Sequence, residues 1–195
     1  MSTKQHKTSR DLQAEARREQ LLDCAVTVFA EKGPNAGIKD IAAVAGVASG
    51  LVYHYFESKQ DLLQTLVRER TFASPLEEFL RDPGEASVLA VLHRVVEIYD
   101  EWLARFGPVV PILDELARRD PEFAEYRWRV VNQQFRSLAG YLDGRVAAGE
   151  LRPHNTDVAS RALLYPLFLD RQSSHLGPAF GAALADLLYE GMRPK

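Results

Sequence analysis

The segment from Ile38 to Phe56, IKDIAAVAGVASGLVYHYF, has the residue types and spacing with the most specific chemistry in this chain. Two apolar stretches, each about two helical turns long, flank Gly46. A glycine can adopt the left-handed conformation that a sharp turn between helices requires, so the pattern is typical of a helix-turn-helix. The second stretch would present small and then hydrogen-bonding side chains, which suits entry into the major groove of DNA: Ala48, Ser49, Gly50, Tyr53 and His54.

The spacing alone leaves a second interpretation open, because an αα-hairpin that binds nothing also has two short helices and a glycine turn. The neighbouring helix gives the segment a place to pack. Leu22, Val26 and Phe29 recur at helical spacing and form an apolar stripe, against which Val47 and Val52 would be buried.

Helical periodicity continues along the whole chain, interrupted by Gly and Pro. Ser58 is a predicted N-cap, and Asn155 or Thr156 is another. We find no segment with the alternation of a strand, so the predicted fold class is all-α. The predicted helices cover about 11–32, 38–45, 48–56, 59–74, 85–106, 109–119, 122–149, 156–170 and 178–189.

The composition, with 46% hydrophobic and 26% charged residues, is that of a soluble globular protein. No apolar run approaches the ~18–20 residues of a membrane span, and residues 1–10 lack the apolar centre of a secretory signal. The single cysteine, Cys24, fits a reducing cytoplasm, where we expect the protein to reside.

The distribution of charge along the chain indicates that one end of the protein faces a polyanion. The net charge of −3 argues against indiscriminate coating of nucleic acid. Lys4, Lys7 and Arg10 nevertheless precede every acidic residue, and the excess of Asp and Glu lies in the later part of the chain. Such an asymmetry indicates an N-terminal end that contacts a polyanion, although mobile basic tails occur in proteins of every kind.

More specific motifs run without gaps from Arg18 to Val67. On these motifs the stretch resembles the DNA-binding domain of the TetR-type (tetracycline-repressor-like) transcriptional regulators. The motifs are Leu21-Leu22-Asp23-Cys24-Ala25, Phe29-Ala30-Glu31-Lys32-Gly33, Ile41-Ala42, Ala45-Gly46-Val47, Tyr53-His54-Tyr55-Phe56 and Ser58-Lys59-Gln60-Asp61-Leu62-Leu63.

The resemblance implies roles for the matched positions. The helix over about 48–55 would be the recognition helix, and Tyr55 and Phe56 would face inward. Tyr53 and His54 would contact the phosphate backbone and a base edge, and Lys39 and Lys59 would contact phosphate. The complete implied DNA-binding set is Lys39, Ala48, Ser49, Gly50, Leu51, Tyr53, His54 and Lys59.

The chain also departs from the family pattern. Family members usually carry Thr before the first helix of the helix-turn-helix, and here Ala36-Gly37 stands in its place. This predicts a weakly capped helix. Leu51 and Ala48 replace what are often Thr and Ser, so we hypothesise a shift of base preference toward thymine methyl groups.

The resemblance also implies a domain organisation. A three-helix domain over 11–74, with the helix-turn-helix at about 37–56, would be joined to a helical ligand-binding and dimerisation domain over 75–195. The chain would then be a homodimeric regulator of a palindromic operator on double-stranded DNA, most simply a repressor released by a small apolar ligand, with activation left open.

A ligand pocket is predicted where aromatic residues gather in the middle of the chain beside a few polar ones, although such a stripe is also typical of a plain core. The predicted lining is His93, Val96, Tyr99, Trp102, Phe123, Trp128, Asn132 and Phe135. A dimer interface is predicted from 162–169, which is apolar on all sides, and from a stripe on the last helix. Its residues are Leu163, Leu167, Leu184, Leu187 and Leu188.

Two rival functions compete with this interpretation. An enzyme is disfavoured because the chain has no nucleophile elbow, no phosphate-binding glycine loop and no pair of histidines at metal-ligand spacing. No cofactor or metal is therefore expected. A helical interaction module that has lost DNA binding is the second rival, and a steep loss of DNA affinity with rising salt would argue against it.

Overall fold

The computed structural model of the protein describes residues 8–70, 73–173 and 179–194. The described residues contain no strand, which confirms the all-α fold class. Two short 3₁₀ helices lie at Gly33–Asn35 and Gly107–Val109. The α-helices are α1 (Ser9–Lys32), α2 (Ile38–Ala45), α3 (Ser49–Tyr55), α4 (Lys59–Glu69), α5 (Ala73–Arg81), α6 (Val88–Phe106), α7 (Val110–Arg119), α8 (Pro121–Ala147), α9 (Thr156–Ser173) and α10 (Phe180–Met192).

Side-chain caps determine where several helices begin. Thr8 accepts a hydrogen bond from the Asp11 backbone N–H at the start of α1. Ser58 caps α4 in the same way through Asp61, as predicted. The Asp61 carboxylate, in turn, accepts from the Glu57 N–H. Because each cap joins residues three or four apart, these helix starts depend on local sequence alone.

The predicted helix 59–74 is wrong at its C-terminal end. Helix α4 ends at Glu69, and a separate helix, α5, begins at Ala73. Ser74, the last residue of the predicted helix, and Pro75 lie in the first turn of α5. The missing N–H of Pro75 costs nothing there, because the N–H groups of a first turn have no partner within the helix. The predicted domain boundary at 74/75 therefore falls inside α5.

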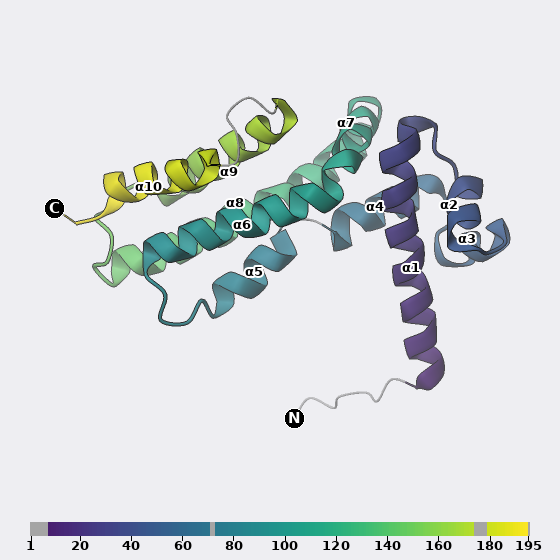
Figure 1. Cartoon of the computed structure of the whole chain (residues 1–195), viewed down its shortest axis with the longest axis horizontal. Coiled ribbons are helices and arrows are strands. Elements are labelled where there is room, and N and C mark those ends of the chain that lie inside the picture. Colours follow the sequence, from purple (N-terminus) through teal and green to yellow (C-terminus); the bar gives the residue numbers. More distant parts are fainter. Residues whose placement is uncertain (1–7, 71–72, 174–178, 195) are drawn as a thin grey trace.

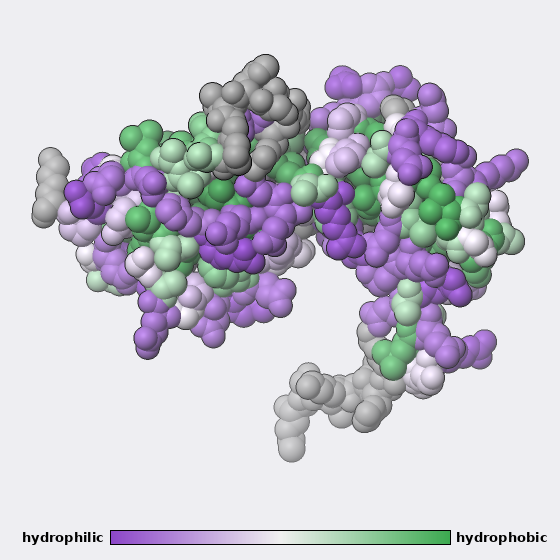
Figure 2. Space-filling model, viewed as in Figure 1, coloured by the Kyte–Doolittle hydropathy of each residue, from purple (hydrophilic) through white to green (hydrophobic). Residues whose placement is uncertain are grey.

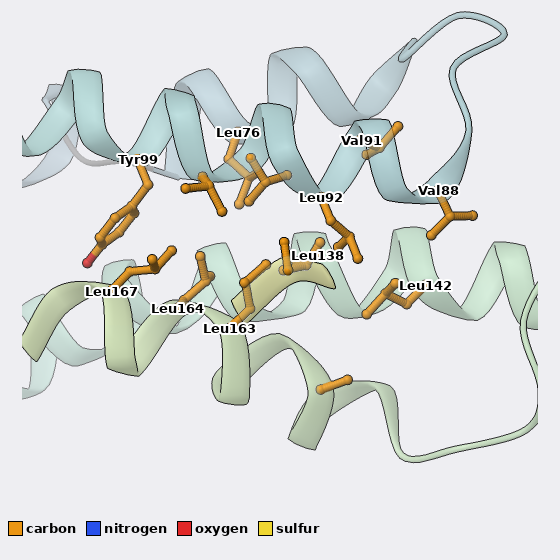
Figure 3. Close-up of a cluster of buried hydrophobic side chains, with 14 of the residues drawn as sticks. Leu76, Val88, Val91, Leu92, Tyr99, Leu138, Leu142, Leu163, Leu164 and Leu167 are labelled. Atoms are coloured by element: carbon orange, nitrogen blue, oxygen red, sulfur yellow. The ribbon is translucent and has the colours of Figure 1, made fainter. Parts of the chain in front are cut away.

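The described residues form two hydrophobic clusters, and the helices that carry them lie at opposite ends of the molecule in Figure 1. The N-terminal cluster contains side chains of α1, α2, α3 and α4. Val109 and Ile112, from the segment around α7, complete it. The second cluster lies among α5, α6, α8, α9 and α10, and Figure 3 shows Leu92, Leu138 and Leu163 meeting there. Helix α7 thus belongs by sequence to the second half of the chain and by packing partly to the first.

The helix-turn-helix lies at the end of the molecule farthest from the C-terminus. In Figure 1, α6 and α8 run along the body, α5 lies on one side of them, and α9 and α10 lie on the other. Helices α2 and α3 lie on the outer side of α1. Among the described residues, no helix combines the length and apolar character needed to cross a bilayer.

Candidate functional site

The turn between α2 and α3 has the predicted geometry. Gly46 has a φ of 67°, which is the left-handed region, and its N–H donates to the Ala43 carbonyl. The N–H of Val47 donates to the Ala42 carbonyl at 2.9 Å. Val52 is fully buried in the N-terminal cluster. The turn therefore packs one side of α3, through Val52, into the N-terminal cluster and leaves its other side exposed.

The free side of α3 carries the predicted DNA-binding residues. Tyr53 is 55% exposed, and His54 beside it is exposed as well. Small residues precede them at the N-terminal end of the helix: Ala48 and Gly50 are exposed, and Ser49 and Leu51 are half-buried. Lys39, in the first turn of α2, is exposed, whereas Lys4 and Lys7 lie outside the described residues.

Lys59, the other predicted phosphate contact, lies in a more enclosed position. Its Nζ lies 5.6 Å from the centre of the Phe29 ring, and the side chain is half-buried. Burial lowers the pKa of the Lys59 ammonium, and the nearby Asp40 carboxylate opposes that shift. A DNA phosphate would meet a cation that is already positioned against the domain core.

Helix α2 lacks a side-chain cap at Gly37, as predicted, but has another support. The Gly37 N–H donates to Asp40 Oδ2 at 2.8 Å. Lys32 Nζ contacts Asp40 Oδ1 at 2.5 Å. The lysine contact, together with the Gly37 N–H, lowers the pKa of the Asp40 carboxyl. The helix start is therefore tied to the end of α1 by a carboxylate instead of a threonine hydroxyl.

A cavity of about 340 Å³ lies between the two hydrophobic clusters. Its walls come from both halves of the chain: Val26 of α1 and Leu66, Val67 and Arg70 of α4 face residues of the C-terminal helices. The lining residues from the C-terminal half of the chain are Tyr99, Trp102, Phe106, Val109, Val110, Leu113, Ala117, Ala124, Arg127, Trp128, Val130, Val131, Gln134, Phe135, Leu164, Tyr165 and Phe168.

The cavity includes half of the predicted pocket. Tyr99, Trp102, Trp128 and Phe135 line it. Tyr99 is 2% exposed, and burial raises the pKa of its hydroxyl, which keeps that group protonated. Trp128 is 53% exposed and so lies where the cavity meets solvent.

The other predicted pocket residues do not line this cavity. His93 Nε2 lies 2.8 Å from Asp186 Oδ1 of α10, on another side of α6. Val96 packs against Gly181, where a Cβ would clash with it. Phe123 is fully buried near the start of α8. Asn132 Nδ2 donates to the Trp128 carbonyl.

Three polar lining residues were not predicted: Arg70, Arg127 and Gln134. The sequence predicted Asn132 as the lining amide, and the adjacent Gln133 is exposed and donates to Glu77. The polar group that lines the cavity is the next residue, Gln134. One position along a helix rotates a side chain by about 100°, so only the orientation of α8 decides which amide faces inward.

Direct contacts link the cavity walls to the helix-turn-helix end. The Trp102 indole N–H donates to the Arg70 carbonyl at 2.6 Å, and Arg105 pairs with Asp23 of α1 at 2.8 Å. Gln60 Nε2, next to Lys59, donates to Asp120 at 2.5 Å. Asp120 is also the N-cap of α8, so α4 contacts the C-terminal helices at both of its ends.

The predicted dimer residues divide into two groups. Leu163 and Leu167 are 1% and 3% exposed inside the protomer's own cluster, so neither side chain offers surface to a second copy. Leu184 and Leu188 are partly buried against the same cluster, and Leu187 is 69% exposed. Figure 2 shows apolar side chains at the surface over α10. On α9 the exposed apolar residues are Val158, Tyr165 and Leu169.

Comparison with known proteins places the chain among transcriptional regulators. The family model described as "Bacterial regulatory proteins, tetR family" matches residues 21–66. The HTH-type transcriptional repressor KstR2 of Mycolicibacterium smegmatis is 32% identical over 157 residues, which are 72% of this chain and 70% of that protein.

Two further similarities cover most of the chain. The fatty acid metabolism regulator protein of Bacillus subtilis is 36% identical over 137 residues, which are 68% of this chain and 70% of that protein. The solved structure of the fatty acid degradation regulator FadR from Bacillus halodurans is 25% identical with a TM-score of 0.72, over 90% of this chain and 99% of that one.

Proposed function

The chain belongs to the TetR family of bacterial regulatory proteins and is a DNA-binding transcriptional regulator, and on this premise we propose that it is a homodimeric, ligand-released repressor. Its two copies would bind the halves of a palindromic operator. A small, largely apolar ligand in the cavity would lower the affinity for DNA.

The composition of the cavity wall carries this proposal. Val26 of α1 and Leu66 of α4 line the same cavity as Tyr99 of α6 and Phe135 of α8. A ligand there contacts the DNA-binding end and the C-terminal helices at once. It can therefore bind two arrangements of the domains with different affinity, which is the requirement for ligand control.

The DNA-binding surface in this proposal is the free side of α3 with the adjoining helix starts. Tyr53 and His54 are exposed beside small residues that permit close approach to the bases. Lys39 and Lys59 would contact phosphate on either side. Phosphate contacts orient the domain, and the α3 side chains read the sequence.

The proposed dimer uses the exposed apolar residues of α9 and α10. Leu187 and Leu169 are 69% and 63% exposed, and Tyr165 and Val158 extend the apolar surface along α9. Two copies related by a two-fold axis would cover this surface and place their α3 helices ~34–36 Å apart, which is one turn of DNA.

Selection of bound fragments from a random or genomic DNA pool, at physiological ionic strength, tests the proposal. We expect enrichment of an inverted repeat whose half-sites are about one DNA turn apart. Enrichment of single half-sites would contradict the dimeric arrangement. A folded dimer that enriches no sequence from the pool would contradict the repressor function.

A further inference from the structure

We propose that the cavity binds an elongated apolar molecule that carries a carboxylate, and that Arg70 pairs with this carboxylate in place of the carboxylates of α1. This inference rests on the proposed function, because it names the class of ligand for the same cavity. It also names the contact that the ligand would break.

The charges in the cavity wall give the first argument. Of the described residues that line the cavity, Arg70 and Arg127 carry charge, and neither Asp nor Glu is among them. Most other lining residues are aliphatic or aromatic. A charge buried in such surroundings is tolerated only with a partner of opposite sign. The wall therefore repels a cation and favours a ligand with one anionic group.

The two arginines differ in how they are paired. Arg127 Nη1 lies 2.5 Å from Asp114 Oδ1. This guanidinium is therefore already paired, in an ion pair that links α8 to α7. Arg70 Nη2 contacts Glu19 and lies 3.7 Å from Asp23, but Asp23 also pairs with Arg105 at 2.8 Å. Arg70 therefore shares both of its carboxylate partners: Asp23 with Arg105, and Glu19 with Arg18, whose Nη1 lies 3.8 Å from the Glu19 carboxylate.

The Nε atom of Arg70 gives the second argument. It is buried and has no hydrogen-bond partner within the described part of the chain. A guanidinium binds a carboxylate best through two parallel N–H groups, and an Nε with an adjacent Nη forms such a pair. A ligand carboxylate would satisfy the Nε donor that the α1 carboxylates leave without a partner.

The rest of the wall describes the body of the ligand. The lining residues of α8 run from Ala124 to Phe135, a distance of about 16 Å at the rise of an α-helix. Gln134 is 9% exposed, and its amide makes no hydrogen bond to the described residues. It offers a neutral polar contact, to the ligand or to a water molecule, on a wall that is otherwise mostly apolar.

Arg70 also connects this ligand to DNA release. It is the C-cap of α4, and its carbonyl accepts the Trp102 N–H at 2.6 Å. Its guanidinium reaches Glu19 on α1, in the domain that carries α3. A carboxylate that takes Arg70 away from Glu19 removes one link between α4 and α1. The ligand thereby favours a different arrangement of the DNA-binding end.

The test uses the intrinsic fluorescence of the full-length dimer, because both tryptophans of the chain, Trp102 and Trp128, line the cavity. Dodecanoate, dodecanol and dodecylammonium, kept below their micelle concentrations, have the same apolar chain and a negative, neutral or positive end. We expect dodecanoate to bind at least about tenfold more tightly than dodecanol, as a charge-assisted hydrogen bond provides, and dodecylammonium to bind most weakly.

Three variants assign the preference to Arg70. Arg70→Gln should bring the affinity for dodecanoate down to that for dodecanol. Arg94→Gln is the matched control, because Arg94 pairs with Glu97 and Glu101 on α6 and does not line the cavity. Glu19→Gln keeps Arg70 and removes its competitor, so it should tighten dodecanoate binding by severalfold.

Equal affinity for the three probes, or a preference for dodecanoate that survives Arg70→Gln, would overturn the inference. If Arg70→Gln fails to fold, Glu19→Gln decides, and unchanged or weaker dodecanoate binding overturns it. Operator binding by the native dimer, free of ligand, separates the two proposals. Intact operator binding without a preference for dodecanoate rejects only the ligand class, whereas loss of operator binding rejects the proposed function.

Discussion

The indole N–H of Trp102 donates a hydrogen bond to the carbonyl oxygen of Arg70 at 2.6 Å. Trp102 lies on α6 in the cavity wall, and Arg70 ends α4, the last helix of the DNA-binding end. One side chain thus lines the cavity and contacts the helix that, in the proposed mechanism, responds to a bound ligand. The bond also satisfies a carbonyl at a helix C-terminus, where the last turn lacks partners.

Trp102→Phe should weaken the coupling between ligand and DNA. It removes the N–H and leaves the Arg70 carbonyl without this donor, which we expect to lower the free energy of unfolding by about 1 kcal/mol. Operator affinity with and without a bound ligand should then differ less than in the native protein. Trp128→Phe serves as the control, since Trp128 lies on α8 at the cavity edge. Equal coupling in the two variants would contradict the role of Trp102.

The double variant Tyr53→Ala with Lys59→Ala should bind the operator more weakly while remaining dimeric. Its logarithmic salt slope should fall by about 1 for each DNA phosphate that the variant no longer neutralises. Lys59 lies over the Phe29 ring, so the variant should also lose about 0.5–1 kcal/mol of stability. Gel shifts over a salt series and denaturant unfolding separate the two effects. Operator binding equal to that of the native protein would refute the assignment of these residues.

Gly46→Ala should destabilise the DNA-binding end, because residue 46 has a φ of 67°. A Cβ in the left-handed region costs about 1–2 kcal/mol, although open space surrounds the position. Gly140→Ala is the matched control: it lies inside α8, also in open space, and should stabilise the protein by about 0.5–1 kcal/mol. Urea unfolding of both variants gives the comparison, and shifts of the same sign would argue against a strained turn.

The Asp40 carboxylate should make the stability of α2 depend on pH. Its pKa in the folded protein is lowered by Lys32 and by the Gly37 N–H. The stabilisation is therefore fully present above the unfolded pKa of about 4, and it disappears as pH falls through the lower folded pKa. The difference in urea midpoint between the native protein and Asp40→Asn should shrink over that window. A difference that stays constant from neutral to acid pH would contradict this role of Asp40.

Substitutions in α9 and α10 should separate the interface from the core. Leu187→Glu places a charge on a side chain that is 69% exposed, so we expect monomers with nearly native stability. Leu163→Ala empties part of the protomer core and should lower the free energy of unfolding by about 2–5 kcal/mol. Light scattering and thermal unfolding test both. A Leu187→Glu protein that stays dimeric would exclude this part of α10 from the interface.

The sequence by itself determined the features that depend on neighbouring residues. The Gly46 turn and the Ser58 cap follow from groups a few positions apart. Their interactions form within one or two helical turns, so residue type and spacing are enough. The same reasoning misplaced the end of α4, because Ser74 and Pro75 suit a helix start as well as a stop.

Only the tertiary structure decided which side of each long helix faces which neighbour. On α8, the Asn132 amide donates to the Trp128 carbonyl, Gln133 donates to Glu77, and Gln134 lines the cavity. On α9, Leu163 is buried in the protomer and Leu169 is exposed, although the segment is apolar on all sides. Periodicity gives the angle between side chains on one helix but not the rotation of that helix in the fold, which depends on how distant helices pack against it.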